Sequence, residues 1–354
     1  MVFDEITARF ARFEIIKSVK NVLPKCFFMA RKYFSGFTGS AGTAVVTKNS
    51  AYLWTDGRYF LQAATQLKGT GVQLMKMGEP EVPTIEEFLK AELKENEVLG
   101  FDGRTIGQQE GEHFAEIVEE KNGNIVYEYD LLGELWSNRP EMSKKPAFLL
   151  PLNYAGESVE SKLTRIRKVM KEHKATMQIL ASLDDIDWML NMRGDDVEYS
   201  PLLLSYAIVK MDEVELYVDA EKLDEELKKH LQDNHVKVYA YDSIYQRVKE
   251  ISENETVMVD PRQVNYALFN NIPKEVKVVK EENPIILMKA VKNDIEVENI
   301  RNAHIKDGVA HTKYMYWLKK HVGKEKITEI SASDKLAAFR AEQEGYLWPS
   351  FGPI

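Results

Sequence analysis

Glycine and other small residues crowd into one short stretch of this chain, and that stretch constrains the fold more than any other. Gly36, Gly39, Ser40 and Gly42 fall within seven residues, and two short apolar runs follow them. This spacing predicts a tight backbone loop that leads into a β-hairpin. The second run ends in the charged turn Thr55-Asp56-Gly57-Arg58. A carboxylate and a guanidinium are therefore expected side by side where a strand passes into a helix.

The chemistry of this turn suits recognition of a planar, electron-rich group. An arginine guanidinium can bind a carboxylate or a carbonyl through two parallel hydrogen bonds, so Arg58 is a candidate substrate-binding residue. The alternative is an ordinary glycine-rich turn beside a surface Asp/Arg pair, because short glycine motifs are weak signals. The residues of this turn leave both interpretations open. Trp54, just before the turn, is interpreted as a buried core residue from its place in an apolar run, with a pocket wall as the alternative.

Composition limits the classes of function. The 354 residues are typical of two or three domains, and 44% hydrophobic with 29% charged residues is typical of a soluble globular protein. A net charge of −9 gives no electrostatic reason to bind nucleic acid or an anionic membrane. No apolar run approaches the roughly 18 residues of a membrane helix, and residues 1–30 carry charges throughout, unlike a secretory signal. The single cysteine, Cys26, cannot form an internal disulfide, which fits a cytoplasmic protein.

Strand and helix signals alternate along the chain, which predicts the α/β class. Residues 137–156 hold three prolines and little periodicity, and they are predicted to be a linker between two such domains. Expected strands in the first domain are 43–47, 51–55, 72–77 and 98–102, with helices at 59–67 and from Thr84. Expected strands in the second are 177–181, 202–210, 214–219, 236–241 and 257–259, with helices at 161–173 and from Asp260-Pro261 through Ala267.

The last part of the chain is predicted to be helical. A long helix should begin at Asn293-Asp294 and end near Lys320, with apolar residues mostly on one stripe. A second helix should begin at Thr328 or Ser331 and end near Gly345. The final residues, 350–354, are expected to start a strand.

Four stretches, spread over nearly the whole chain from about Arg31, carry distinctive sequences. They are YFSGFTGSAGTA followed by WTDGRYFLQAA (33–64), LDDIDWMLNMRGDDVEYSPLLLSYAIV (183–209), KAVKNDIEVENIRNAHIKDGVA (289–310) and EISASDKLAAFR (329–340). In this order they resemble the Xaa-Pro aminopeptidases, the three-domain aminopeptidase P type of the creatinase/prolidase superfamily. The resemblance implies two creatinase-N-like α/β domains, at 1–140 and 156–283, followed at 289–354 by the first helices of a pita-bread catalytic domain.

The resemblance also implies an activity. These enzymes remove the N-terminal residue from peptides whose second residue is proline. Their dinuclear centre, usually two manganese ions, is held by two aspartates, a histidine and two glutamates. In this family the arginine of WTDGR contacts the peptide, which implies substrate binding by Arg58. The resemblance further implies a homodimer.

The family's metal ligands lie on strands beyond the predicted helices, so we expect this chain to stop before them. The chain is then expected to have no catalytic and no metal-ligating residue of its own and to be inactive alone. No substitute site is evident. His304 and His311 lie two helical turns apart, about 10 Å by helix rise, too far for one ion. The aspartates at 184, 185, 187, 195 and 196 lack a histidine or glutamate at ligand spacing and are predicted to be solvated.

Some features leave alternatives open. Residues 1–29 do not resemble the family, and the strand expected there is not evident, so the first sheet is in doubt. The chain could be a fragment, or a non-catalytic peptide- or protein-binding module of the same superfamily; creatinase or prolidase chemistry fits the WTDGRYFLQAA motif less well. Arg193-Gly194-Asp195-Asp196 is either a contact toward another domain or subunit, or a plain exposed turn. The apolar face of the helix at 294–320 predicts self-association of the chain.

Overall fold

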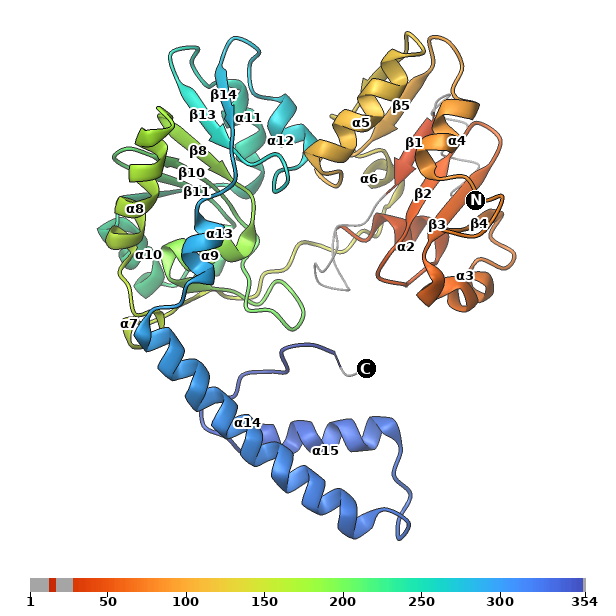
Figure 1. The fold of residues 1–354 in the computed structure, drawn as a ribbon. Helices are drawn as coiled ribbons and strands as arrows, with labels where there is room; N and C mark the ends of the chain where they lie inside the picture. Colours follow the sequence, from red (N-terminus) through yellow and green to blue (C-terminus); the bar gives the residue numbers. More distant parts are fainter. Residues whose placement is uncertain (1–12, 17–27, 353–354) are drawn as a thin grey trace.

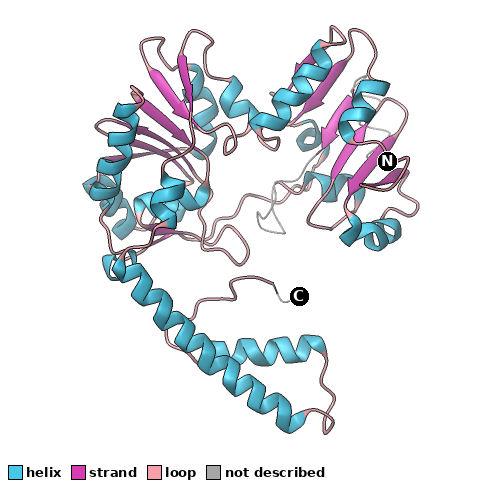
Figure 2. Ribbon diagram, in the orientation of Figure 1, coloured by secondary structure: helices cyan, strands magenta, loops and turns pink. Residues whose placement is uncertain are grey.

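The computed structural model describes residues 13–16 and 28–352. It contains two α/β domains and a helical hairpin (Figure 1). We call residues 13–136 domain 1, residues 147–290 domain 2 and residues 294–341 the helical hairpin. Each domain has a sheet with helices packed beside it, whereas the hairpin consists of helices alone (Figure 2). No helix within these described ranges combines the length and apolar content needed to cross a membrane.

Domain 1 is built on one mixed sheet. Its strands are β1 (Phe13–Ile16), β2 (Thr43–Val46), β3 (Ala51–Thr55), β4 (Val72–Lys76), β5 (Val98–Phe101) and β6 (Asn124–Val126). Its helices are α2 (Ala30–Ser35), the 3-10 turn η1 (Gly57–Tyr59), α3 (Phe60–Gln66), α4 (Ile85–Glu92), α5 (Gln108–Glu119) and α6 (Leu131–Leu135).

The strands of this sheet lie in the order β4-β3-β2-β1-β5-β6. Strand β2 is antiparallel to its neighbours β1 and β3, and the remaining pairs are parallel. All strands except β2 therefore direct their carboxyl ends to one edge of the sheet. In open α/β sheets this is the edge at which ligands bind. The turn that contains Arg58 follows β3 and so lies on this edge.

Domain 2 has the same architecture. Its main sheet is formed by β8 (Met177–Leu180), β10 (Tyr206–Lys210), β11 (Val214–Tyr217), β12 (Val236–Tyr239), β13 (Thr256–Val259) and β14 (Lys277–Lys280). Its helices are α8 (Val159–Glu172), α9 (Leu183–Leu190), the 3-10 turns η2 (Ala220–Lys222) and η3 (Tyr241–Ser243), α10 (Glu225–Asp233), α11 (Ile244–Lys249), α12 (Tyr266–Asn270) and α13 (Ile285–Ala290). The strand order, β12-β11-β10-β8-β13-β14, repeats that of domain 1 strand for strand, with the same parallel and antiparallel pairs.

The expectation that residues 1–29 lack a strand is wrong. Strand β1 pairs with β2 on one side and β5 on the other, so it lies in the middle of the sheet. Four residues, FEII, are too few to show a period of two, and the surrounding charges hide the apolar pair Ile15-Ile16 in the sequence. Cys26 lies outside the described residues.

The prediction of a helix from Asp260-Pro261 is also wrong. Helix α12 begins at Tyr266, with Asn265 as the N-cap residue. The carboxylate of Asp260 accepts a hydrogen bond from the backbone N–H of Arg262, two residues on. A helix N-cap would make the same bond, but here the chain forms only a turn, in which the N–H of Gln263 donates to the carbonyl of Asp260 over 3.0 Å. The helix begins where Asn265 Oδ1 accepts the N–H of Leu268 at 2.8 Å.

The predicted linker and the C-terminal segment differ in detail from expectation. The segment 137–156 is mostly irregular, but it contains strand β7 (Phe148–Leu149), which pairs with β9 (Met192–Arg193), and the one-turn helix α7 (Leu152–Ala155). The described residues at the end of the chain, 350–352, form no strand.

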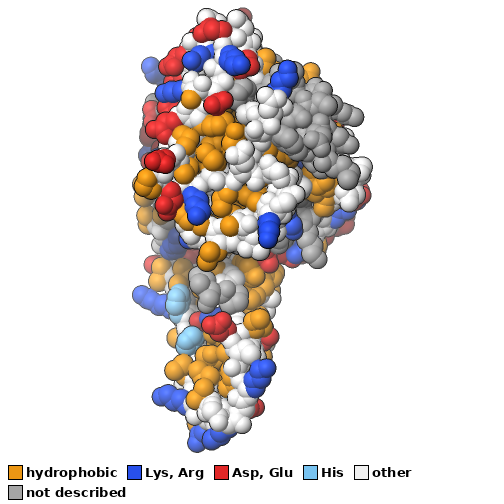
Figure 3. Space-filling model, turned by 90° about the vertical axis from the view of Figure 1, so that its right-hand side faces the viewer, with side chains coloured by type: hydrophobic (Ala, Val, Ile, Leu, Met, Phe, Trp, Pro, Cys, Tyr) orange, Lys and Arg blue, Asp and Glu red, His pale blue; other side chains and the backbone are white. Residues whose placement is uncertain are grey.

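The helical hairpin agrees with the sequence. It consists of α14 (Asp294–His321) and α15 (Glu329–Ala341), and both begin with a capping box. The two helices are joined by ion pairs such as that between Arg340 and Asp307, whose Nε and Oδ1 atoms are 2.6 Å apart. Figure 3 shows apolar side chains gathered on the hairpin at the lower end of the molecule. The exposed apolar side chains of α14 include Ile300, Ile305, Val309, Met315 and Tyr316.

Candidate functional site

The glycine loop between α2 and β2 is held from inside by a buried arginine. Arg31 is 4% exposed, and its Nη1 donates a hydrogen bond of 2.6 Å to the carbonyl of Gly42. Its Nη2 donates to the carbonyl of Gly39. A Cβ atom at Gly39 would lie 2.3 Å from the ring of Phe37, so only glycine fits there. One guanidinium therefore fixes the loop at two points.

Side-chain hydrogen bonds join the same loop to β3 and α3. Ser40 Oγ lies 2.6 Å from the hydroxyl of Tyr59, and Thr55 Oγ1 donates to the carbonyl of Ala41 over 2.7 Å. The amide nitrogen of Thr38 donates to Gln66 Oε1 over 3.0 Å. The structure thus brings together the two halves of the motif that the sequence singled out.

Arg58 is displayed at the surface of this assembly. Its backbone N–H and Nε donate to Asp56 Oδ1 at 3.1 and 2.8 Å, and Nη2 donates to Asp56 Oδ2 at 2.8 Å. The side chain remains 69% exposed, with Cζ 5.2 Å from the centre of the Tyr59 ring. The hydrogen bonds that the Arg58 guanidinium donates to the Asp56 carboxylate raise the pKa of Arg58, which stays a cation at any working pH.

This geometry specifies how Arg58 can meet a ligand. A guanidinium has five N–H donors, and Asp56 takes two of them along the Nε–Nη2 edge. A second carboxylate or carbonyl must therefore approach the Nη1–Nη2 end. Asp56 and Arg58 do not bind a ligand together. Both carboxylate oxygens of Asp56 accept from Arg58 and orient it, and the more exposed guanidinium is the group available to a ligand.

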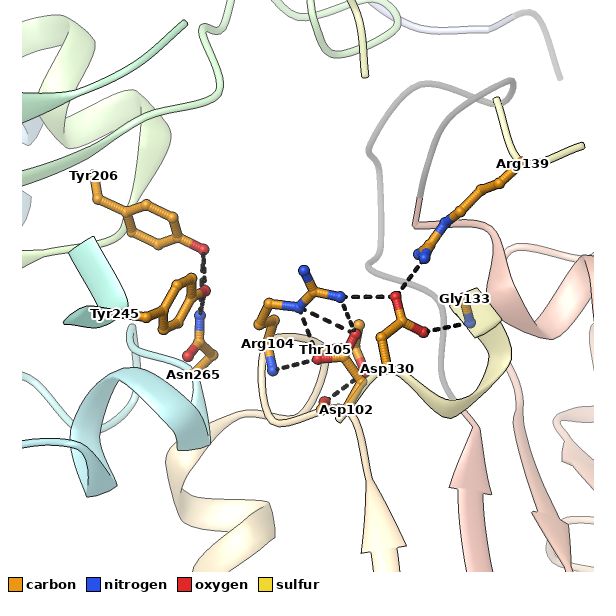
Figure 4. A network of polar contacts seen from close by, with 9 residues as sticks. All are labelled: Asp102, Arg104, Thr105, Asp130, Gly133, Arg139, Tyr206, Tyr245 and Asn265. Carbon is orange, nitrogen blue, oxygen red and sulfur yellow. Dashed lines mark hydrogen bonds and ion pairs between the residues drawn. The ribbon is translucent and has the colours of Figure 1, made fainter. Parts of the chain in front are cut away.

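The Asp-x-Arg turn recurs at two other strand ends. Asp102-Gly103-Arg104 follows β5 and Asp260-Pro261-Arg262 follows β13, with the same pattern of hydrogen bonds from the arginine to the aspartate. Arg104 is more deeply set, with a side chain 23% exposed, and it also pairs with Asp130 at 2.8 Å (Figure 4). The repeated letters DGR were visible in the sequence, but only Arg58 was selected. The turn is a structural device: the Arg262 side chain is also 50% exposed but pairs in addition with Glu282 at 2.9 Å, and Arg58, at 69%, is the most exposed of the three arginines.

Trp54 is confirmed as a core residue. It is 1% exposed, and its Nε1 donates a hydrogen bond of 2.8 Å to the carbonyl of Pro83. The ring packs against Phe88, with the ring centres 5.1 Å apart. Trp54 is part of β3, and its ring contributes to the apolar core of domain 1.

The predicted solvation of the acidic clusters is wrong for three members. Asp185, Asp187 and Asp196 are at most 1% exposed. Asp185 accepts from Lys289 Nζ at 2.6 Å, and Asp196 pairs with the buried Lys222 at 2.8 Å. These partners are distant in sequence, so the letters alone did not reveal them. Arg193–Asp196 is not a plain exposed turn, because Arg193 donates to the carbonyl of Asp187 and Asp196 is buried, although Asp195 is 36% exposed. A contact of this stretch with another domain or subunit stays a prediction.

No group of three or more histidine, cysteine, aspartate or glutamate side chains among residues 13–16 and 28–352 is arranged to hold a metal ion. His304 and His311 are exposed on α14, and His304 Nδ1 instead lies 2.8 Å from the carbonyl of Ile300 on its own helix. The described residues therefore do not fit a dinuclear centre.

Asp187 should give the protein an unusual pH dependence. Burial raises the pKa of its carboxyl well above the ordinary value, although the amide N–H of Leu203 partly opposes this. Between the unfolded pKa, about 4, and the raised folded value, the folded chain retains a proton that the unfolded chain releases, so stability falls as pH rises. We expect Asp187→Asn to melt at a higher temperature than the parent at pH 7, with a difference that shrinks toward pH 4. A difference in melting temperature between Asp187→Asn and the parent that is the same at pH 4 as at pH 7 would contradict this; thermal denaturation of both proteins from pH 4 to 8 measures it.

Two family models match the chain. Both describe a Creatinase/Prolidase N-terminal domain, one over residues 29–126 and the other over residues 138–296. The chain belongs to the creatinase/prolidase family. The two matches correspond to the two domains of equal topology, and the fold and the resemblance expected from the sequence are confirmed.

Proteins similar to this chain include Xaa-Pro aminopeptidases. Aminopeptidase P2 of Arabidopsis thaliana is 35% identical over 92% of this chain and 51% of its own length. A probable Xaa-Pro aminopeptidase P of Chaetomium globosum is 37% identical over 92% of this chain and 54% of its own. The crystal structure of X-prolyl aminopeptidase from Caenorhabditis elegans, described as a cytosolic enzyme with a di-nuclear active site, matches with a TM-score of 0.87 and 32% identity, over 96% of this chain and 57% of that one. This chain spans about half the length of the curated relatives it matches.

Proposed function

We propose that this chain is the substrate-recognition part of a cytoplasmic, homodimeric Xaa-Pro aminopeptidase, an enzyme that releases the first residue of peptides with proline second. The observation that carries the proposal is Arg58, an outward-facing guanidinium oriented by Asp56 on the ligand-binding edge of domain 1. The similarity to X-prolyl aminopeptidase over nearly the whole chain supports it. The metal centre, for which we propose two manganese ions, would lie in the portion of the relatives that this chain does not match.

Arg58 would act by binding and not by chemistry. Its Nη1 and Nη2 atoms can donate to a peptide carbonyl or carboxylate, and Asp56 keeps the guanidinium in one orientation before the peptide arrives. Such preorganisation lowers the entropy lost on binding. The bound peptide would then be held in one register relative to the metal centre.

Residues 289–354 would be the beginning of the pita-bread catalytic domain. In support, α14 extends away from domain 2 (Figure 1) and carries exposed apolar side chains along its length. In a complete enzyme these side chains would pack against the catalytic sheet. In the chain as given, they remain the basis of the predicted self-association.

The role of Arg58 can be tested in a chimera that joins this chain to the unmatched portion of the C. elegans enzyme. We expect Arg58→Ala to lower kcat/KM for an Xaa-Pro peptide by about ten- to a hundredfold, because a hydrogen bond to a charged group contributes about 1.5–3 kcal/mol. Arg58→Lys should recover only part of this, since an ammonium lacks the planar fork. Steady-state kinetics with manganese measures both.

A matched control is Lys48→Ala, which removes another exposed cation from domain 1 at the turn between β2 and β3. It should leave kcat/KM within about twofold of the parent chimera, as expected for a surface substitution far from any special contact. Equal losses for Arg58→Ala and Lys48→Ala would mean that general charge, not the Arg58 site, governs binding. An Arg58→Ala chimera with parental kinetics would refute the assigned role.

A second candidate is a peptide-binding module without hydrolytic activity, which the exposed Arg58 guanidinium would serve equally well. Calorimetry with the 354-residue chain and an Xaa-Pro peptide separates the two. Binding without cleavage in manganese, together with an inactive chimera, would support the module. An active chimera supports the aminopeptidase.

A further inference from the structure

The two domains meet through equivalent parts of their structures. The loop after β5, residues 102–108, and the loop after β13, residues 260–266, occupy the same place in two sheets of identical strand order. Each begins with an Asp-x-Arg turn, so that Asp102 and Asp260 are counterparts. Figure 4 shows the first loop on one side of the boundary and Asn265, from the second loop, on the other.

The hydrogen bonds between these loops are reciprocal. Gln108 N donates to the carbonyl of Val264 over 3.0 Å, and Tyr266 N donates to the carbonyl of Ile106 over 2.8 Å. Counting from the two aspartates, residue 108 corresponds to 266 and residue 106 to 264. The bridge between Gly107 and Asn265 therefore joins a residue to its own counterpart. This is the pattern of an isologous, two-fold contact, here made within one chain.

The side chains at the counterpart positions 266 and 108 differ, and both are buried in the contact between the domains. The ring of Tyr266 enters the core of domain 1, with its centre 5.2 Å from that of Phe101 and 5.0 Å from that of Tyr127. It lies so close to α5 that a Cβ atom at Gly111 would be 2.1 Å from it. Its counterpart Gln108 is 2% exposed and accepts a hydrogen bond from Asn270. Domain 2 thus contributes a core residue to domain 1.

This contact lies on the same sheet edge as the Arg58 turn. Strands β3 and β5 are parallel to each other through β2 and β1, and their carboxyl ends are separated by three strand spacings, about 14 Å. The position of Arg58 relative to domain 2 and the hairpin therefore depends on this contact and on the irregular segment 138–146, which connects the domains covalently.

We propose that Tyr266 and Gly111 are positioning residues: the Tyr266 ring, seated over Gly111, fixes the orientation of domain 1 and thereby sets where Arg58 meets the peptide. The second half of this inference rests on the proposed function, whereas the first half does not. Main-chain hydrogen bonds alone would align the loops but resist rotation weakly. The buried ring supplies about 150–250 Å² of further contact.

The orientation is tested first on the 354-residue chain by small-angle X-ray scattering. Tyr266→Ala is expected to increase the radius of gyration and broaden the distance distribution, and Tyr266→Phe, which keeps the ring, should match the parent. Phe88→Ala is the control: Phe88 belongs to the same core but contacts Tyr52 and Trp54 within domain 1. It should destabilise domain 1 without moving it. Unchanged scattering for Tyr266→Ala, or the same change for Phe88→Ala, overturns the inference.

Should Tyr266→Ala fail to fold, Gly111→Ala introduces a methyl group under the ring at the surface of α5 and is expected to give the same scattering change.

The consequence for binding is measured in the chimera described above. Tyr266→Ala should raise KM about tenfold with kcat nearly unchanged, and the effect should vanish in an Arg58→Ala background. If the scattering changes but KM does not, Tyr266 still fixes the orientation of domain 1, but the proposal that this orientation positions Arg58 for the peptide is refuted. Loss of all peptide turnover in the parent chimera refutes the proposed function instead.

Discussion

Asp196→Ala is expected to lower the free energy of unfolding by about 3–5 kcal/mol, because it leaves the Lys222 ammonium buried without its carboxylate. Lys222 and Asp196 are at most 2% exposed, and Asp196 Oδ2 also accepts the amide N–H of Leu204 at 2.8 Å. The substitution therefore removes an ion pair and a main-chain acceptor together. Urea denaturation of the 354-residue chain, followed by circular dichroism, measures the loss.

A double substitution separates the charge from the hydrogen bond. Asp196→Asn with Lys222→Met removes both charges, fills the space of the lysine stem and keeps an acceptor for Leu204. Buried ion pairs are often replaceable by neutral groups with little cost. We expect the double variant to lie within about 1 kcal/mol of the parent. A double variant as unstable as Asp196→Ala would show that the pair contributes net stability in its own right.

Arg31→Ala is the second substitution with a large expected effect, a decrease of about 3–6 kcal/mol in the free energy of unfolding. Two hydrogen bonds from its guanidinium, to the carbonyls of Gly39 and Gly42, would be lost, each contributing about 1.5–3 kcal/mol. Arg31→Lys should retain less than half of this, because one ammonium on a single-point stem cannot reach both carbonyls in the fork geometry. Thermal and urea denaturation compare the three proteins.

The loop that Arg31 holds is also tied to the Arg58 turn, so its loss should have a local signature. Hydrogen exchange is expected to accelerate at residues 36–42 in Arg31→Ala under conditions where the rest of domain 1 remains folded. Trp54→Phe, which removes the hydrogen bond to Pro83 and part of a buried ring elsewhere in domain 1, is the control and should not affect this loop. Protection of residues 36–42 equal to that of the parent would contradict the assigned role of Arg31.

Sequence reasoning succeeded where a local signal was strong. Strand β3 was predicted with its observed bounds, since five apolar or β-favouring residues lie between a polar turn and a charged one. The start of α4 was predicted at Thr84, whose side chain does accept the N–H of Glu87. The length of α14 was predicted within a residue or two, because its N-cap and its periodicity agree.

Sequence reasoning failed where contacts between residues distant in the chain determine the structure. Strand β1 becomes a strand through pairing with β2 and β5, which its four residues do not signal. The buried aspartates depend on Lys222 and Lys289, which lie 26 and 104 residues away from Asp196 and Asp185. At the candidate site, the sequence located Arg58 and the glycine loop, but not the buried Arg31 that supports them. The role of Arg58 in binding stays a prediction.

Because the two domains share one architecture, domain 2 contains a turn equivalent to that of Arg58 but with a side chain of opposite charge. Strand β11 is the counterpart of β3, and Asp219 after it accepts the N–H of Glu221 at 3.0 Å, as Asp56 accepts that of Arg58. A 3-10 turn follows in both cases. The same backbone turn thus carries a cation, Arg58, in domain 1 and an anion, Glu221, in domain 2. The conformation of the turn does not depend on the charge of the side chain at this position. The charge can therefore be exchanged without a change in the backbone.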